Sequence, residues 1–280
     1  MSITFTKMQG LGNDFVVIEN ITQQFIPSKE TIKQIAERHY GVGCDQIIVV
    51  EKPRNTGTDF FMRVFNADGE EAERSGNGAR CFAKFVIDQS LTDKHHIIAD
   101  TKSGKITVCL QDDNNVKVDM GVPSFSPKTI PFLAPEASLL YKLDLPDQLI
   151  NSVQIGVVSI GNPHAVLQVP NVTTAPVDQL GIVIANHPRF PEGVNVGFME
   201  IKSNNCINLR IYERGTSETL ACGSGACAAV AIGRLLGLLD ENVIVKMHGG
   251  ELQISWAGMG EPIWMTGPAK KVFSGNLTLK

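Results

Sequence analysis

Short apolar runs recur along the chain between turn-forming residues such as Gly, Asn, Asp and Pro. Runs of this length, rich in β-branched and aromatic residues, are typical of β-strands. In the first half, the runs that predict strands are Phe15–Ile18, Gln46–Val50, Phe60–Phe65, Lys105–Leu110 and Val116–Met120. The chain is therefore expected to be rich in β-structure.

Three segments predict helices. Residues 28–39 carry Ser28 as an N-cap, buried-type positions such as Ile35, and Gly41 just beyond the end. The run Ala79–Asp88 spaces its phenylalanines for burial on one face, and Ala226–Leu239 is apolar almost all round. A helix that is apolar all round is buried rather than half-exposed.

Four segments of the first half recur in the second half, in the same order and 146 to 149 positions later. The matched pairs are GNDFVV (12–17) with GNPHAV (161–166), SGNGA (75–79) with CGSGA (222–226), SGKITV (103–108) with GGELQI (249–254), and DMG (119–121) with MTG (265–267). Arg63 and Arg210 also each lie twelve residues before the second pair. Each match is weak alone, but their order and nearly constant offset indicate two homologous halves.

The fold class that follows is α+β, with two pseudo-symmetric, sheet-rich domains that each wrap on a central helix. The expected domains are residues 1–124 and 125–268, joined near the Pro- and Ser-rich segment 123–135. Residues 269–280 have no counterpart in the first half and are expected to return to it. Two such halves usually face each other across a cleft, which is where ligands tend to bind.

Composition excludes several classes of function. Hydrophobic residues make up 43% of the chain and charged residues 19%, as in an ordinary globular protein. The net charge is -4 and no Lys/Arg-rich run occurs, which argues against nucleic acid as a partner. No apolar stretch is long enough to predict a membrane span, and the first residues lack a secretory pattern. We therefore expect a cytoplasmic protein.

The six cysteines favour reduced thiols over disulfides in a chain of this kind. They are Cys44, Cys81, Cys109, Cys206, Cys222 and Cys227. None belongs to a paired CxxC or HxxxH pattern, so no metal is predicted. Neither a dinucleotide fingerprint nor a Walker A motif is present, so no cofactor is predicted either.

The repeated turns at Ser75 and Cys222 are the best candidates for chemistry. Glycines after Cys222 free several N–H groups to converge at a helix N-terminus, a setting that binds anions and lowers a cysteine pKa. A lone Cys-Gly-Ser-Gly would more often be a small buried residue with glycines for close packing. The related turn at Ser75 favours function, because two acid–base groups on opposite faces of one carbon allow inversion.

Seven segments together resemble the diaminopimelate epimerase family. They are KMQGLGNDFVVIE, GVGCDQIIVV, FNADGEEAERSGNGARCFA, IGNPHAV, GVNVGF, RIYERGTSETLACGSGACAA and WMTGPA, and they run in family order from residue 7 to 269. The resemblance implies two domains with pseudo-twofold symmetry and an active site between them. It also implies epimerisation of LL-diaminopimelate to the meso form without pyridoxal phosphate, in lysine and peptidoglycan precursor synthesis, and often a homodimer.

The resemblance assigns roles to individual residues. Cys222 takes the place of the catalytic thiol that accepts the proton, and His164 and Glu213 lie at supporting catalytic positions. The substrate-binding positions are Asn13, Gln46, Asn66, Gly76, Asn77, Asn162, Asn195, Glu213, Arg214, Gly223 and Ser224. These types suit a substrate with two amino-acid ends, because Arg214 can hold a carboxylate bidentately and Glu213 can meet an ammonium group. Taken singly, Asn13 or Asn195 would more often be structural, and His164 is equally consistent with a core residue.

Ser75 departs from the family pattern, which has a second catalytic cysteine at this position. A serine hydroxyl is a far weaker acid than a thiol and needs a strong adjacent base to react. The chain is therefore expected to epimerise poorly. An engineered Cys→Ser change and a natural variant both explain the serine, and the intact pattern around it favours the former.

Two other functions stay open on the sequence alone. One is a proline-type racemase or a PhzF-like isomerase of the same superfamily, which proline binding would distinguish. The other is a binding protein that keeps the cleft but has lost catalysis, for which Ser75 is the only support. Ligand binding without hydrogen exchange at Cys222 would favour the binding protein.

Overall fold

The computed structural model describes residues 2–72, 75–145 and 150–278, which form two compact units. The first unit comprises Met1–Asp119 and Thr266–Lys280, and the second comprises Met120–Met265. Each unit is described by itself below.

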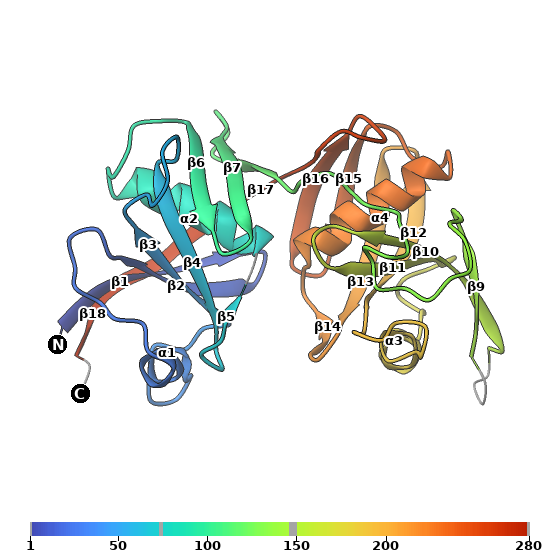
Figure 1. Ribbon diagram of the computed structural model, residues 1–280, viewed down its shortest axis with the longest axis horizontal. Helices are drawn as coiled ribbons and strands as arrows, with labels where there is room; N and C mark the ends of the chain where they lie inside the picture. Colours follow the sequence, from blue (N-terminus) through green and yellow to red (C-terminus); the bar gives the residue numbers. More distant parts are fainter. Residues whose placement is uncertain (1, 73–74, 146–149, 279–280) are drawn as a thin grey trace. The chain divides into compact units, whose positions relative to one another are not determined.

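The first unit contains strands on both sides of a long helix, α2 (Figure 1). Its elements are β1 (Ser2–Gly10), β2 (Asn13–Glu19), α1 (Lys29–Ala36), β3 (Gln46–Glu51), β4 (Phe60–Asn66), β5 (Glu71–Ala72), α2 (Gly76–Asp88), β6 (His96–Thr101), β7 (Gly104–Leu110), β8 (Val116–Asp119) and β18 (Lys270–Thr278). Along this unit, β1–β2 is antiparallel, β2–β3 parallel, β3–β4 and β4–β5 antiparallel, β4–β6 parallel, and β6–β7 antiparallel.

The second unit repeats this order of elements around its own central helix, α4 (Figure 1). Its elements are β9 (Tyr141–Asp144), β10 (Ser152–Ser159), β11 (Pro163–Gln168), α3 (Val177–Ala185), β12 (Asn195–Ser203), β13 (Cys206–Glu213), β14 (Ser217–Thr219), α4 (Gly223–Leu235), β15 (Asn242–Met247) and β16 (Gly250–Trp256). Strand β17 (Ile263–Gly267) begins in this unit, and its last two residues belong to the first. From β10 to β16, the succession of antiparallel and parallel pairs is the same as from β1 to β7. The sequence repeat therefore corresponds to a repeated topology.

Each unit buries one helix and packs a second against a sheet. Every residue of α4 from Gly225 to Gly233 is buried, and the phenylalanines of α2 are buried as well. The outer helix α1 inserts Ile32 and Ile35 into a cluster with β1 to β4, and α3 uses Leu180 and Ile184 in the same way. The α+β, two-unit, sheet-rich fold predicted from the sequence is confirmed.

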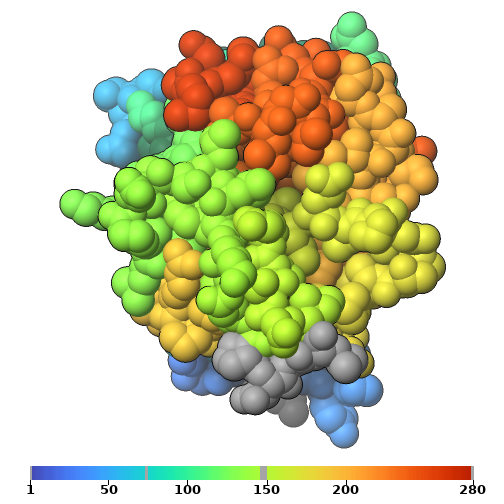
Figure 2. All heavy atoms as spheres, turned by 90° about the vertical axis from the view of Figure 1, so that its right-hand side faces the viewer, coloured from blue at the N-terminus to red at the C-terminus, as the bar shows by residue number. Residues whose placement is uncertain are grey.

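The Pro- and Ser-rich segment 123–135 belongs to the second unit rather than to a free junction. Ile130 and Phe132 are buried in that unit's core, and the Phe132 ring stacks on Phe190 with centroids 4.6 Å apart. Figure 2 shows the surrounding face, where the segments coloured green to yellow cover much of the surface. The chain division falls at Asp119, a few residues before the segment.

Two helix ends differ from the expectation. The predicted helix over 226–239 ends at Leu235, because Gly237 adopts a positive φ of 71° and Leu238 donates its N–H to the Gly233 carbonyl. This is a Schellman motif, which halts a helix even when the following residues are apolar. The helix predicted over 28–39 ends at Ala36, because Glu37 is extended and its carboxylate accepts the His39 N–H in a turn.

Strand β18 completes the sheet of the first unit. Its residues pair antiparallel with β1 from Ser2–Thr278 to Gln9–Lys270, with one irregularity near Met8. The last segment of the chain thus lies beside the first. Within the described residues, no helix has the length and apolar character needed to cross a bilayer.

Candidate active site

The turns at Ser75 and Cys222 have nearly the same backbone. Each residue is the N-cap of its unit's central helix, with φ −146° and ψ 107° at Ser75 and φ −129° and ψ 113° at Cys222. The first N–H groups of a helix have no partner within it. Each turn therefore presents backbone donors and the positive end of a helix dipole to an anion.

A side chain in place of either turn glycine would force a neighbouring side chain to move. A Cβ at Gly78 would lie 2.9 Å from the Ser75 Oγ, and a Cβ at Gly225 would lie 2.4 Å from the Ile211 Cδ1. Both distances are below normal van der Waals contact. The turns are thus packed closely on the capping residue in one unit and on β13 in the other.

The capping side chains behave differently. The Ser75 Oγ accepts the Gly78 N–H at 3.1 Å, which is an ordinary N-cap hydrogen bond. The Cys222 Sγ lies 3.5 Å from the Ser224 Oγ. The serine hydroxyl thus stabilises its helix, whereas the thiol lies among the Ser224 hydroxyl, the Gly225 N–H and the Glu213 carboxylate.

The expectation of a lowered pKa at Cys222 is wrong for this structure. Burial raises the pKa of the thiol well above its usual range, and the neighbouring Glu213 carboxylate raises it further. Cys222 is 7% exposed, and a thiolate in so apolar a place is poorly solvated. Desolvation is the largest cause of the shift, and it outweighs the hydrogen bonds from Ser224 and Gly225 that lower the pKa.

A hairpin tip holds the charged residues beside Cys222. Glu213 ends β13, and its Oε1 accepts a hydrogen bond of 2.6 Å from the Thr219 hydroxyl. The backbone N–H of Arg214 donates to the Asn195 Oδ1 at 3.0 Å, and the Arg214 Nη1 donates to the Glu192 carbonyl at 2.7 Å. Sequence reasoning missed Thr219, although it lies in the matching segment six residues after Glu213.

A bidentate ion pair clamps the same hairpin in both units. Arg210 binds Glu218 through Nε and Nη2 at 2.6 and 2.5 Å. In the first unit, Arg63 binds Glu71 through the same two nitrogens at 2.9 Å each. Bidentate pairs of this kind fix orientation as well as distance. Each pair joins the strand before the turn to the short strand that leads into it.

The side-chain amides of the predicted site in the first unit hydrogen-bond to one another in two pairs. The Gln46 Nε2 donates to the Asn66 Oδ1 at 2.8 Å, at the start of β3 and the end of β4. The Asn77 Nδ2 donates to the Asn13 Oδ1 at 3.3 Å. Asn77 is 6% exposed, and its own Oδ1 is buried without a hydrogen-bond partner among the described residues. A buried, unpaired acceptor is costly and marks a place where a ligand donor can bind.

His164 orients Asn162 in the second unit. The two side chains are joined by a hydrogen bond of 3.0 Å between the His164 Nε2 and the Asn162 Oδ1. Burial lowers the pKa of His164 to about 3, with a further contribution from the Arg214 charge. The imidazole is therefore neutral and donates its Nε2–H. The sequence alone did not decide between a core and a functional role for His164, and its burial allows both.

The predicted site residues thus fall into two sets, one in each unit. The first unit holds Asn13, Gln46, Asn66, Ser75, Gly76 and Asn77, and the second holds Asn162, His164, Asn195, Glu213, Arg214, Cys222, Gly223 and Ser224. In each set, contacts link the asparagines to neighbouring polar groups at strand and helix ends. Among the described residues, no group of three His, Cys, Asp or Glu side chains could hold a metal ion.

Solved structures share this fold at low sequence identity. A hydroxyproline epimerase from Agrobacterium vitis matches 99% of this chain and 92% of its own, with a TM-score of 0.72 and 12% identity. A probable proline racemase from Agrobacterium radiobacter K84 matches 99% of this chain and 93% of its own, with a TM-score of 0.71 and 15% identity. A PhzF-family phenazine biosynthesis protein from Bacillus anthracis covers both chains completely, with a TM-score of 0.68 and 15% identity.

Sequence comparison is more specific. The family model described as diaminopimelate epimerase matches residues 5–126 and 156–272. A diaminopimelate epimerase from Laribacter hongkongensis (strain HLHK9) is 52% identical over 281 residues, which span all of both chains. Both matches include the turns at Ser75 and Cys222. The chain therefore belongs to the diaminopimelate epimerase family.

Proposed function

We propose that this chain interconverts LL- and meso-diaminopimelate by proton transfer at the α-carbon, without a cofactor, in lysine and peptidoglycan precursor synthesis. The observation that carries the proposal is the 52% identity to a diaminopimelate epimerase over the full length of both chains. The internal repeat supports it, because two matched turns suit a reaction in which one group removes a proton and another returns it.

Cys222 is the proton-transfer group of the second unit in this proposal. Its raised pKa suits a carbon acid, since a thiolate that holds its proton tightly is a stronger base toward an α-hydrogen. The N–H groups of Gly223 and Ser224 would hold the substrate carboxylate next to the reacting carbon. Charge that develops on that carbon would be stabilised by the same donors. Glu213 and His164 support the site, the former beside the thiol and the latter through Asn162.

Neutral amides supply most of the proposed substrate contacts. The binding residues are Asn13, Gln46, Asn66, Gly76, Asn77, Asn162, Asn195, Glu213, Arg214, Gly223 and Ser224. Asn195 and Asn77 are both nearly fully buried, and buried amides bind ammonium and carboxylate groups without adding net charge. The Arg214 guanidinium can bind a second carboxylate bidentately, as a substrate with two amino-acid ends requires.

Ser75 disables the second proton-transfer position in this proposal. Its hydroxyl accepts the Gly78 N–H, which leaves one lone pair and a very weakly acidic proton. No carboxylate or imidazole is hydrogen-bonded to it within the described residues. The chain is therefore expected to exchange the α-hydrogen at Cys222 while inverting the carbon slowly.

The proposal extends to assembly and location. All six cysteines are free thiols in the structure, and a catalytic thiol must stay reduced to work. A reducing compartment preserves such thiols, so we place the protein in the cytoplasm. We also expect a homodimer, as is common in the family.

Turnover of the Ser75→Cys variant tests the proposal. The variant should convert LL-diaminopimelate to the meso form at least about 10²-fold faster than the parent chain, because a general acid–base group typically contributes that much. Chiral chromatography of the product measures the rate, and L-proline serves as the control substrate. Equal rates for the Ser and Cys forms, or faster racemisation of proline than of diaminopimelate, would contradict the proposal.

A further inference from the structure

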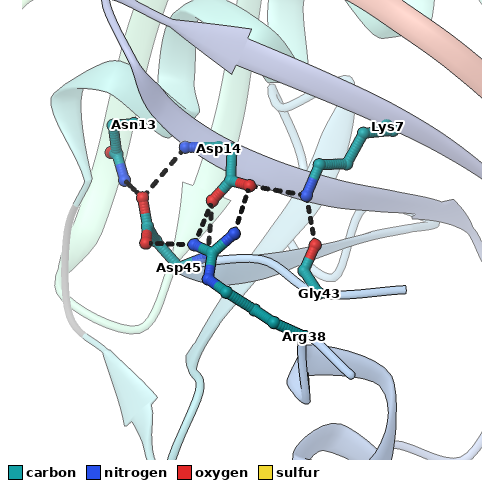
Figure 3. Close-up of polar contacts among 6 residues, drawn as sticks. All are labelled: Lys7, Asn13, Asp14, Arg38, Gly43 and Asp45. Atoms are coloured by element: carbon teal, nitrogen blue, oxygen red, sulfur yellow. Dashed lines mark hydrogen bonds and ion pairs between the residues drawn. The ribbon is translucent and has the colours of Figure 1, made fainter. Parts of the chain in front are cut away.

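A carboxylate outside the proposed site fixes the amide of Asn13. The Asn13 Nδ2 donates to the Asp45 Oδ2 at 2.8 Å (Figure 3). Asp45 can only accept hydrogen bonds when ionised, so it determines which end of the Asn13 amide faces it. The carbonyl end of Asn13 is thereby directed away from Asp45.

Strand pairing explains why Asp45 lies at this point. Strands β2 and β3 are parallel, with Phe15 opposite Gln46, so Asp14 and Asp45 are neighbours where the two strands begin. They exchange hydrogen bonds, since the Asp14 N–H donates to the Asp45 Oδ2 at 3.0 Å and the Asp45 N–H donates to the Asp14 Oδ1 at 2.8 Å. The Asp45 carboxylate is therefore held by backbone as well as by side chains.

Two cations neutralise this pair of carboxylates. The Arg38 guanidinium donates to both oxygens of Asp14, at 2.9 and 3.0 Å, and to the Asp45 Oδ1 at 2.8 Å (Figure 3). Lys7 donates to the Asp14 Oδ2 at 2.6 Å and to the Gly43 carbonyl. Although burial raises the pKa of Asp14, hydrogen bonds from Arg38 and Lys7 hold it well below its usual range. Asp14 is thus ionised, and two cations face the two carboxylates.

The orientation of the Asn13 amide also fixes that of Asn77, in the turn at Ser75. The Asn13 carbonyl accepts from the Asn77 Nδ2 at 3.3 Å, so the nitrogen of Asn77 is engaged and its Oδ1 points elsewhere. That Oδ1 is the buried acceptor without a partner, on a residue 94% shielded from solvent. The turn around it offers N–H donors, and the Ser75 Oγ already accepts the Gly78 N–H. The Asn77 Oδ1 is therefore an acceptor of the turn that has no hydrogen-bond partner among the described residues, and it suits a ligand group that donates.

We propose that Asp45 is a positioning residue that sets the hydrogen-bond polarity of Asn13 and, through it, of Asn77. In this role it makes the turn at Ser75 present one acceptor, matched to a ligand ammonium group, beside donors matched to a carboxylate. The inference rests on the proposed function, because it takes diaminopimelate as the ligand. Without Asp45, the Asn13 and Asn77 amides would be free to reverse, and the acceptor would be replaced by a donor.

Calorimetric binding to the parent chain and to Asp45→Ala tests the inference, with two ligands. Diaminopimelate carries ammonium groups, whereas pimelate has the same carbon chain and carboxylates without them. We expect Asp45→Ala to bind diaminopimelate about tenfold more weakly, the usual size for a hydrogen bond to a charged group, and to bind pimelate as the parent does. Asp45→Asn keeps one acceptor oxygen and should lose less than Asp45→Ala.

Two controls separate positioning from general destabilisation. Asp59 is a matched carboxylate of the same unit, since it accepts from Lys94 at 2.6 Å and from the Ile98 N–H at 2.9 Å. Asp59→Ala should leave the affinity for both ligands unchanged. In an Asn13→Ala background, Asp45→Ala should have no further effect on affinity, because its role acts through Asn13.

The outcomes distinguish the positioning role of Asp45 from the proposed function. Equal weakening for both ligands, unchanged diaminopimelate affinity in Asp45→Ala, or additive losses with Asn13→Ala would overturn the positioning role while leaving the proposed function intact. Failure of the parent chain to bind diaminopimelate at all would instead overturn the proposed function. Should Asp45→Ala not fold, Asp45→Asn carries the same comparison of the two ligands.

Discussion

The two units anchor a corresponding asparagine by opposite means. Asn13 and Asn162 lie 149 positions apart in the repeat, the first at the start of β2 and the second just before β11. Asn13 gives its amide nitrogen to the carboxylate of Asp45, whereas Asn162 gives its amide oxygen to the neutral imidazole of His164. The position that corresponds to Asp45 in the second unit is Val194, which is buried in an apolar core. The Asn13 oxygen thus accepts from Asn77 in one unit, whereas the Asn162 oxygen is engaged by His164 in the other.

The capping residues of the central helices show a second contrast of this kind. Ser75 is occupied by its N-cap hydrogen bond, and Cys222 is a buried thiol beside a carboxylate. The backbone angles at the two positions differ by less than 20°. The comparison teaches that the repeat supplies matched backbone donors, while the side chains decide which turn can transfer a proton.

The largest expected effect separates the two turns by hydrogen exchange. Cys222→Ala should slow solvent deuterium incorporation at the α-carbon of diaminopimelate by about 10²- to 10⁴-fold, because it removes the thiol proposed to transfer the proton. Ser75→Ala should change that rate by less than about twofold, since its hydroxyl is not the base. Proton NMR in heavy water follows both variants. Similar losses in the two variants would show that the turns share the chemistry despite their different side chains.

The next effect is the pH dependence of stability, which differs between the buried His164 and the charged cluster of Asp14, Arg38 and Asp45. Because burial lowers the pKa of His164 to about 3 from an ordinary value near 6.5, the unfolded chain binds a proton that the folded chain does not. Stability of the second unit is therefore lost as the pH falls from about 6.5 toward 3, by up to about 1.4 kcal/mol per pH unit. Ionised Asp14 also stabilises the fold, because its pKa is lowered in the folded chain. That contribution is lost only below its ordinary pKa near 4.

Tryptophan fluorescence measures this pH dependence in one unit, because Trp256 and Trp264 both lie in the second. Urea unfolding at several pH values should show a shallower loss in His164→Gln than in the parent chain. A parent chain whose second unit is equally stable at pH 4 and pH 7 would contradict a neutral His164.

The smallest effect concerns the helix cap. Ser75→Cys should lower the free energy of unfolding by up to about 1 kcal/mol, because a thiol is a weaker acceptor for the Gly78 N–H than a hydroxyl. The same substitution is expected to raise turnover, so activity and stability should change in opposite directions. Denaturant unfolding followed by circular dichroism measures the change. A more stable Cys variant would show that the serine cap contributes nothing.

Local signals in the sequence predicted the fold well. The Ser28 cap, the two glycine-flanked turns and the fully apolar run of α4 all lie where the structure has helix starts and a buried helix. The ends of helices were less predictable, because Gly237 stops α4 through its backbone conformation while the surrounding residues stay apolar. The two-unit repeat was visible because it leaves matched segments at a nearly fixed offset.

The sequence proposed residue types for the candidate site but could not supply their electrostatics. The raised pKa of Cys222 depends on burial by segments distant in sequence, which a local motif does not contain. The Asp14, Arg38 and Asp45 cluster depends on the parallel pairing of two strands that begin about thirty residues apart. The roles assigned to the individual site residues remain predictions for the experiments above.

The return of β18 to β1 has a consequence for synthesis on the ribosome. The first unit begins at the N-terminus, yet its sheet is closed only by residues 270–278, after the whole second unit has been made. At translation rates of about 5–20 residues per second, β1 waits roughly 13–52 s with one edge unpaired. An open edge of nine residues is a site for pairing with other chains. During that interval the nascent chain is therefore more exposed to pairing through β1 than the finished protein is.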